Sequence, residues 1–351
     1  MSKLDPAKIS ALKALLRQNR LDGYIISDFH DLKYFLGNTL ALEREGIMLA
    51  HKNGIYVTAR SLYEAPITAA FPQIKTEGCD VNRPAKIVEA AKKLGLKNIA
   101  FDGDKEIYTT GKVYAKAGFK ELNGLISSLR VSKTEAEVKI MKESARILYA
   151  AFKYIRKFLK PGVTEREIAA LIENYMKEHG ASGVSFPVSV MFGPSASDPH
   201  HRPTSAIKLK KNMPVLMDFG CYYKNYCSDI TRTFWYGDKP SPEFKKVYKI
   251  VKDAHDMVVK KAKYGMSGAQ IDAISHGHIE AAGYGKYFTH RTGHGIGLQP
   301  HEPADLSQFN QNKIDLNYCF SVEPGIYLPG KFGVRYEDCF YMTKQGIKIL
   351  G

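Results

Sequence analysis

The chain of 351 residues exceeds the length of one typical domain, so we expect two hydrophobic cores. Its apolar share of 44% and charged share of 25% are typical of a globular protein and exclude a fibrous or disordered chain. The formal net charge of +15 comes from lysines spread along the whole sequence. Because these lysines form no basic tract interleaved with aromatic residues, we expect a solvated surface and no nucleic-acid partner.

The sequence also carries signals about its compartment. No stretch approaches the roughly 18 consecutive apolar residues of a membrane-spanning helix, and the first residues lack the apolar core and cleavage site of a signal peptide. We therefore expect a cytoplasmic protein without a membrane partner. The cysteines are odd in number and lie in apolar or loop contexts, as is typical of reduced thiols: Cys79, Cys221, Cys227, Cys319 and Cys339.

The first third of the chain alternates helical and extended patterns, which predicts an α/β domain over residues 1–129. Apolar residues recur at helical spacing over residues 9–17 and 86–93. Strands are expected at 23–26 and 98–102, and a β-hairpin is expected from the runs at 46–50 and 54–58.

A second domain is expected over residues 133–351. The polar segment 127–133 runs into a long helical pattern over 135–159, which ends before Pro161 and Gly162. Helix-end signals follow: Thr164 with Glu167 and Ser267 with Gln270 have capping-box spacing, Ser241 and Pro242 fit a helix start, and Gly180 and Gly265 fit helix stops. Strand-like runs at 213–219, 228–235, 318–322 and 334–342 make this an α+β domain.

Two of these strand-like runs carry an aspartate among apolar residues. Asp218 interrupts an apolar strand, and Asp229 follows eleven residues later, after a polar turn rich in tyrosine. A buried unpaired carboxylate costs several kcal/mol in practice, so each needs a partner. A hairpin would bring the two together. For either aspartate alone, a strand-end position or an ion pair such as Asp229 with Arg232 is the simpler interpretation.

Two glutamates repeat this pattern near the C-terminus. Glu323 follows an apolar run and precedes Pro324, and Glu337 lies in a run whose alternation would put Arg335, Glu337 and Cys339 on one face. One such glutamate is commonly a salt-bridge partner. Four carboxylates on interior strands of one domain would repel each other, and bound cations are the usual way to neutralise such a cluster.

Residues 290–303 contain three histidines among closely spaced glycines. Gly293 and Gly295 permit backbone geometry around His294 that other residues would not allow. The glycine spacing lacks the last step of a dinucleotide fingerprint and no helical pattern follows, so no dinucleotide cofactor is expected. A lone histidine is more often a structural hydrogen bonder, but beside four such carboxylates His294 is a candidate metal ligand.

One imidazole and four carboxylates form an oxygen-rich donor set. Such a set favours divalent ions of the Mn²⁺ or Co²⁺ kind, with Fe²⁺ or Zn²⁺ as alternatives, over a thiolate-type zinc site. Cys221 has an odd offset from Asp218 and should point to the other face of the strand, whereas Cys227 could share a face with Asp229. Both cysteines are expected to pack as small apolar side chains.

The second domain resembles the pita-bread metallopeptidases, the family of prolidase, Xaa-Pro aminopeptidase and methionine aminopeptidase. The resemblance runs from Lys133 to the end of the chain and includes the five candidate ligands. Its motifs are Met217-Asp-Phe-Gly, Ser228-Asp-Ile-Thr-Arg-Thr, Thr292-Gly-His-Gly-Ile-Gly, Ser321-Val-Glu-Pro-Gly-Ile-Tyr and Gly333-Val-Arg-Tyr-Glu-Asp.

This resemblance implies a role for each residue of the site. Asp218 would bind one ion, His294 and Glu323 the other, and Asp229 and Glu337 would bridge both. Glu323 would also act as base and then acid. The remaining candidates are His290, His301 and one of the adjacent His200 and His201, which would orient the scissile amide, and Arg335, which would orient an aspartate or meet a substrate carboxylate.

The first domain loosely resembles the creatinase-type N-terminal domain, on Leu21-Asp-Gly-Tyr-Ile-Ile-Ser-Asp and Leu32-Lys-Tyr-Phe-Leu-Gly. That domain accompanies prolidases and Xaa-Pro aminopeptidases. The resemblance thus implies a homodimeric exopeptidase that cleaves short peptides with proline second, by attack of a metal-bridged hydroxide. Dipeptidase and aminopeptidase both stay open. The alternatives are a methionine-type aminopeptidase and an inactive binding module, although an inactive member is expected to lose ligands and none is missing.

Overall fold

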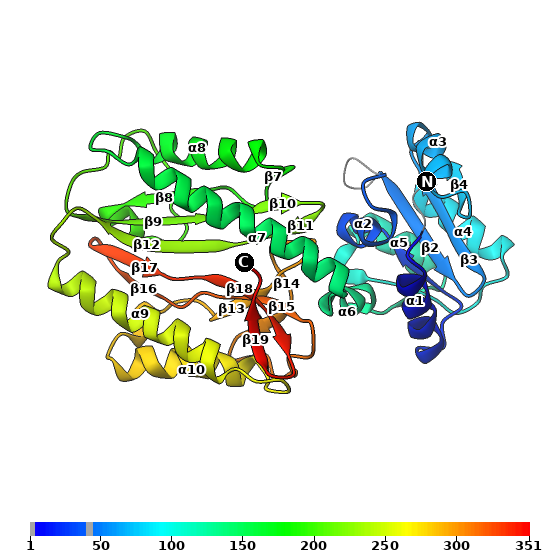
Figure 1. Cartoon of the computed structure of the whole chain (residues 1–351). Helices are drawn as coiled ribbons and strands as arrows, with labels where there is room; N and C mark the ends of the chain where they lie inside the picture. The colour runs from blue at the N-terminus through cyan, green and yellow to red at the C-terminus, as the bar shows by residue number, and fades with distance from the viewer. Residues whose placement is uncertain (1–3, 40–44) are drawn as a thin grey trace. The chain divides into compact units, whose positions relative to one another are not determined.

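The computed structural model describes residues 4–39 and 45–351. The chain divides into two compact units, Met1–Arg130 and Val131–Gly351, and each is described by itself (Figure 1). Within the described residues, no helix has both the length and the apolar character needed to cross a membrane.

The first unit is an α/β domain built on one mixed sheet of six strands, in the order β4-β3-β2-β1-β5-β6. The predicted hairpin at 46–58 and the strand at 23–26 are confirmed, and they form its centre. The strands are β1 (Gly23–Ile26), β2 (Gly46–His51), β3 (Gly54–Ala59), β4 (Lys75–Gly78), β5 (Ile99–Phe101) and β6 (Lys120–Glu121). The helices are α1 (Pro6–Gln18), α2 (Phe29–Leu36), α3 (Ser61–Ala70), α4 (Arg83–Lys93), α5 (Tyr108–Lys116) and α6 (Leu125–Val131), with a 3-10 turn at Gly103–Lys105.

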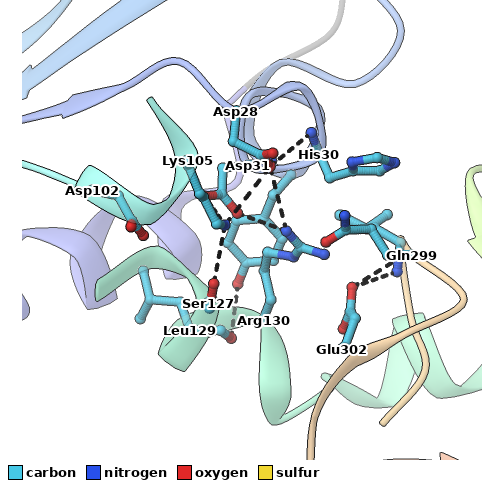
Figure 2. A network of polar contacts seen from close by, with 12 residues as sticks. Asp28, His30, Asp31, Asp102, Lys105, Ser127, Leu129, Arg130, Gln299 and Glu302 are labelled. Carbon is cyan, nitrogen blue, oxygen red and sulfur yellow. Dashed lines mark hydrogen bonds and ion pairs between the residues drawn. The ribbon is translucent and has the colours of Figure 1, made fainter. Parts of the chain in front are cut away.

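A buried ion network fastens helix α2 inside the first unit (Figure 2). The carboxylate of Asp31 accepts hydrogen bonds from Arg130 Nη1 at 2.7 Å and from Lys105 Nζ at 2.6 Å. Lys105 also donates to Ser127 Oγ at 3.1 Å. The side chains of Asp31 and Arg130 are each only 3% exposed, so this ion pair is enclosed within the first unit.

The second unit is an α+β domain in which helices cover strands on two sides. In Figure 1, α7 (Glu135–Ile155) and α8 (Glu165–Glu178) lie on one side of the strands, and α9 (Pro242–Lys261) and α10 (Gly268–Ala281) lie on the other. One apolar core joins α7 and α8 to β8 and β9, and two further clusters lie under α9 and α10. Short 3-10 turns lie at Arg156–Phe158, Gly193–Ser197 and Gly285–Tyr287.

The strands of this unit form two sheets of three, a sheet of five and a pair. Their orders are β11-β10-β7, β12-β9-β8, β14-β13-β15-β18-β19 and β16-β17. The bounds are β7 (Gly183–Val184), β8 (Ser189–Phe192), β9 (Met213–Phe219), β10 (Cys221–Tyr223), β11 (Tyr226–Cys227), β12 (Ile230–Tyr236), β13 (Gly293–Gly295), β14 (Glu302–Leu306), β15 (Cys319–Val322), β16 (Gly325–Leu328), β17 (Phe332–Arg335), β18 (Asp338–Thr343) and β19 (Gly346–Ile349).

Most of the predicted helix ends are confirmed. Thr164 and Ser267 each form a complete capping box with the residue three positions on, and Ser241 caps α9 ahead of Pro242. Gly180, with a positive φ of 99°, follows the end of α8. The stop predicted at Gly265 is wrong, because α9 already ends at Lys261.

The predicted strand over 334–342 is also wrong as a continuous element. The chain changes partners there: β17 pairs with β16, whereas β18 pairs with β15. At the break, the backbone N–H of Glu337 donates to Thr231 O at 3.1 Å, so this residue bridges to β12 instead. Simple alternation along residues 335–339 therefore does not hold.

Candidate metal centre

Strands β9 and β12 bring the first two carboxylates together. Asp218 lies on β9 opposite Thr231 of β12, and Asp229 immediately precedes β12. The antiparallel pairing of β9 with β12 confirms the expected hairpin. Its connection is more elaborate than a simple turn, because β10 and β11 form a separate small hairpin there that pairs with β7. After this small hairpin the chain returns beside β9 as β12, so Asp218 and Asp229 line one cavity.

Glu337 reaches this place through the break between β17 and β18. Its Oε2 accepts a hydrogen bond from Thr231 Oγ1 at 2.6 Å, and its side chain is buried. Thr231 thus donates to the carboxylate of Glu337 and also pairs with Asp218 across strands β12 and β9.

His294 is fixed by its own strand and by β15. Its backbone N–H donates to Ser321 Oγ at 3.0 Å, and Ser321 Oγ donates to Glu323 Oε1 at 3.0 Å. A side chain on the preceding Gly293 would place Cβ 1.9 Å from the carbonyl oxygen of Ser321, so only glycine permits this approach.

The ring of His294 has a defined orientation. Nδ1 lies 3.0 Å from the carbonyl oxygen of Gly295 and donates to it, which leaves the lone pair on Nε2. Nε2 faces Glu323 Oε1 at 3.3 Å and Asp229 Oδ2 at 3.7 Å. This is the arrangement of a metal-binding histidine whose second nitrogen is held by a backbone carbonyl.

Three carboxylate oxygens in this cluster are buried and have no hydrogen-bond partner. They are Asp218 Oδ1, Asp229 Oδ1 and Glu337 Oε1. Ligand atoms of Asp229, His294 and Glu337 all lie within 4.8 Å of one another. Because a buried carboxylate oxygen without a partner is costly, these oxygens fit bound divalent cations, which an oxygen-rich set with one imidazole suits.

The electrostatics of the cluster support this fit. Burial, together with repulsion by Glu337, raises the pKa of Asp229 well above its usual value. Burial and the nearby Glu323 do the same to the pKa of Glu337. Burial lowers the pKa of His294 to about 4, so this ring is neutral at pH 7, as a metal ligand must be.

The cluster forms one side of a cavity of about 810 Å³. All five residues predicted as metal ligands line it, although they come from segments spread over more than a hundred positions. The other predicted site residues at its wall are His200, His290, His301 and Arg335.

The structure separates the adjacent His200 and His201. His201 Nε2 lies 2.8 Å from Glu165 Oε2, and the side chain of Glu165 is fully buried. The same oxygen of Glu165 also accepts the backbone N–H of Thr204 at 3.3 Å, which fixes the segment on both sides of Arg202. His200 lines the cavity and His201 does not.

The guanidinium of Arg335 donates hydrogen bonds to three neighbouring side chains of the protein. Its Nη2 donates to Asp218 Oδ2 at 2.6 Å, its Nη1 to Tyr327 Oη at 2.7 Å and its Nε to Thr231 Oγ1 at 3.0 Å. The guanidinium therefore orients Asp218. Of the two roles expected for Arg335, this geometry favours orientation of an aspartate over contact with a substrate carboxylate.

His290 and His301 stand in different surroundings. His290 Nδ1 donates to the carbonyl oxygen of Arg291 at 2.8 Å, and Nε2 lies 2.8 Å from Tyr327 Oη, so both nitrogens are engaged. The ring of His301 meets that of His294 edge-on, with centroids 4.2 Å apart. Burial lowers the pKa of His301 to about 4, so it is neutral at pH 7.

The cysteines take no part in the cavity wall. Cys221 and Cys227 are both fully buried, and Cys221 Sγ lies 3.6 Å from Ser144 Oγ in the core under α7. Sequence analysis missed four supporting residues: Thr231, Ser321, Tyr327 and Glu165. Alternation gave a usable signal for two of them, because Thr231 and Ser321 each lie two positions from a candidate ligand.

Comparisons with known proteins agree with this geometry. The model of metallopeptidase family M24 matches residues 139–344, and that of the creatinase/prolidase N-terminal domain matches residues 8–132. An uncharacterized peptidase of Bacillus subtilis is 34% identical over 348 residues, which are 98% of this chain and 97% of that protein.

Two solved structures are similar over nearly the whole chain. A Xaa-Pro dipeptidase from Bacillus anthracis is 33% identical with a TM-score of 0.92, covering 98% of this chain and 96% of that one. An X-Pro aminopeptidase from Thermotoga maritima is 30% identical with a TM-score of 0.84, covering 96% and 97%.

Metal uptake should release protons. Because the pKa values of Asp229 and Glu337 are raised, a cation that binds these carboxylates competes with protons more strongly than it would at ordinary carboxyl groups. Titration of metal-free protein with Mn²⁺ should saturate at two ions per chain. Affinity should weaken as pH falls, by roughly tenfold per pH unit for each proton displaced.

Calorimetry in buffers of different ionisation enthalpy measures this release directly. The observed heat should vary with the buffer for the native chain and vary less for Glu337→Gln. A heat that is independent of the buffer would contradict the protonation argument.

Proposed function

We propose that this chain, which belongs to metallopeptidase family M24, is a dinuclear exopeptidase that hydrolyses Xaa-Pro bonds at the N-termini of short peptides. The observation that carries the proposal is the convergence of three unpartnered, buried carboxylate oxygens with the oriented Nε2 of His294. The similar solved structures, a Xaa-Pro dipeptidase and an X-Pro aminopeptidase, support the choice of bond.

The proposed ligands divide between two divalent ions, with Mn²⁺ or Co²⁺ favoured and Fe²⁺ or Zn²⁺ as alternatives. Asp218 would hold one ion, His294 and Glu323 would hold the other, and Asp229 and Glu337 would contribute to both. Such ions, when bound, activate water and polarise the scissile carbonyl. Arg335 holds Asp218 in place through its 2.6 Å contact, while Thr231 holds Glu337.

The remaining steps fall to side chains of the cavity. Glu323, which Ser321 orients and which is partly accessible, accepts a proton as base and returns it to the leaving amine. The neutral His301 donates a hydrogen bond to the developing oxyanion. His200, which lines the cavity, orients the scissile amide. His201 holds the backbone next to His200 in place through its contact with Glu165. His290 acts mainly through Tyr327 and Arg335, because its nitrogens are already engaged.

A dipeptidase must recognise the free carboxylate of the proline residue in its substrate. We propose that Arg202 binds this carboxylate. Three arginines line the cavity: Arg335 is paired with Asp218, and Arg291 is paired with Asp305 at 2.7 Å. Arg202 is exposed and makes no ion pair with an acidic side chain in residues 4–39 and 45–351. An exposed guanidinium without an acidic partner is well suited to bind a carboxylate.

The sequence is also compatible with two other functions. An inactive binding module is disfavoured because the complete ligand set converges and its oxygens lack protein partners. A methionine-type aminopeptidase is disfavoured by the creatinase/prolidase N-terminal domain that matches residues 8–132. The substrate series given below distinguishes all three.

We also propose a reducing compartment such as the cytoplasm, because all five cysteines are free and four of them are buried. Homodimer formation, expected from the family resemblance, is part of the same proposal. Sedimentation velocity of the purified chain distinguishes a dimer from a monomer.

The choice of substrate is tested with Ala-Pro, Ala-Pro-Ala, acetyl-Ala-Pro and Met-Ala in the presence of Mn²⁺. We expect turnover of Ala-Pro and loss of turnover on acetylation, because the metal centre must hold a free amine and proline offers no N–H. Equal cleavage of acetyl-Ala-Pro, or a clear preference for Met-Ala, would contradict the proposal.

Ligand variants test the metal assignment. Asp229→Asn and Glu337→Gln should each lower kcat by roughly 100-fold or more, since even residues that support metal ligands account for about 10–100-fold. Cys221→Ser is the matched control and should keep most activity, because Cys221 packs beside the hydroxyls of Ser144 and Ser228 away from the cavity. Equal damage from all three variants would refute the assignment.

Arg202 is tested by comparing Ala-Pro with Ala-Pro amide. Arg202→Met should raise KM for Ala-Pro by about 10- to 100-fold, as expected for a hydrogen bond to a charged group worth about 1.5–3 kcal/mol. The amide should be unaffected. Lys210→Met, which removes an exposed charge from the same segment, should change neither substrate. An equal effect of Arg202→Met on both substrates would exclude carboxylate recognition.

A further inference from the structure

A short turn connects the two histidines that face each other in the cavity. His294 lies on β13, and Gly295 of this strand pairs with Glu302 at the start of β14. Residues 296–301 form the connection and end in His301. The conformation of this turn therefore decides where the ring of His301 stands relative to His294.

Glu302 folds back into this turn and binds its backbone. Its Oε1 accepts the N–H group of Leu298 at 2.8 Å. The same oxygen accepts the N–H group of Gln299 at 3.2 Å (Figure 2). Its Oε2 forms an ion pair with Lys133 Nζ at 2.9 Å. The two charged side chains are 0% and 2% exposed, so the pair is enclosed.

Lys133 is itself held in place. Its backbone N–H donates to Asn317 O at 3.0 Å, and its Nζ donates to Val131 O at 3.3 Å. It directly precedes Thr134, whose capping box starts α7. The ammonium group of Lys133 thus lies next to the capped start of α7, and it holds Glu302 through the ion pair.

Gly297 shows how closely the turn fits this pair. A Cβ at Gly297 would lie 2.4 Å from Glu302 Oε2 and 2.9 Å from Lys133 Cε. The carbonyl oxygen of Gly297 also accepts the N–H of Cys227 at 2.7 Å. The last glycine of the Gly-His-Gly-Ile-Gly segment is therefore required by the ion pair that it covers.

We propose that Glu302 and Lys133 are positioning residues that set the turn and thereby aim His301 at the reacting carbonyl. A buried ion pair is poor evidence for stability, because apolar replacements are often equally stable, so a geometric role explains this one better. The inference rests on the proposed function, in which His301 acts in peptide hydrolysis. It assigns no contact with substrate to Glu302 or Lys133.

The test is a double-mutant cycle between Glu302→Gln and His301→Ala, measured on Ala-Pro with the metal-loaded full chain. Glutamine keeps an oxygen for the turn amides but removes the charge that faces Lys133. Glu302→Gln should lower kcat at least tenfold, change KM less than threefold and leave the metal content unchanged. In the His301→Ala background the same change should lower kcat less than twofold, because its effect passes through His301.

Controls separate this inference from the proposed function. Glu243→Gln, which breaks the exposed pair with Lys331, should leave kcat unchanged. If His301→Ala alone has no effect, the proposed role of His301 fails. If His301→Ala lowers kcat but Glu302→Gln does not, or if the two losses multiply, the positioning inference is wrong.

A second variant covers loss of folding. Should Glu302→Gln not fold, Lys133→Met/Glu302→Gln removes the unpaired charge and is carried through the same cycle. The expected result is again a fall in kcat that disappears in the His301→Ala background, and multiplying losses again overturn the inference. Lys133→Arg keeps the ion pair and should retain more kcat than Lys133→Met.

Discussion

The second unit is organised around buried carboxylates that cannot all be charged without cations. Burial and repulsion by Glu337 raise the pKa of Asp229 well above normal, and burial and repulsion by Glu323 do the same to the pKa of Glu337. Each of these two carboxylates has a buried oxygen with no partner. Arg335 supplies one positive charge, which it gives to Asp218. In the proposed dinuclear centre, metal ions supply the remaining positive charge, and the strands hold the candidate ligands close together.

Hydrogen bonds from neighbouring side chains hold the candidate ligands in place. Thr231 holds Glu337, Ser321 links the backbone of His294 to the carboxylate of Glu323, and Tyr327 joins His290 to Arg335. Farther out, Glu165 fixes His201 and Glu302 fixes the turn before His301. In both places a fully buried carboxylate binds backbone N–H groups next to a histidine of the cavity segments. These hydrogen bonds fix the backbone of the segments that carry the proposed catalytic side chains.

Much of this could be predicted from sequence, because carboxylates within apolar strands are unusual wherever they occur. That reasoning identified the four candidate carboxylates before any pairing of strands was known, and the glycines around His294 added the fifth candidate ligand. It could not place Glu337 correctly, since alternation assumes one continuous strand and the chain leaves the sheet between β17 and β18. Nor could it separate His200 from His201, because the choice depends on Glu165, which lies more than thirty residues away in the sequence.

The central claim is that these five side chains bind two divalent ions in one cluster. Anomalous X-ray diffraction from crystals grown with Mn²⁺, recorded on both sides of the manganese edge, measures this directly. The account predicts two anomalous peaks in the cavity, one beside Asp218, the other beside His294 and Glu323, with Asp229 and Glu337 between them. A single peak, or no peak among these residues at saturating Mn²⁺, would contradict it.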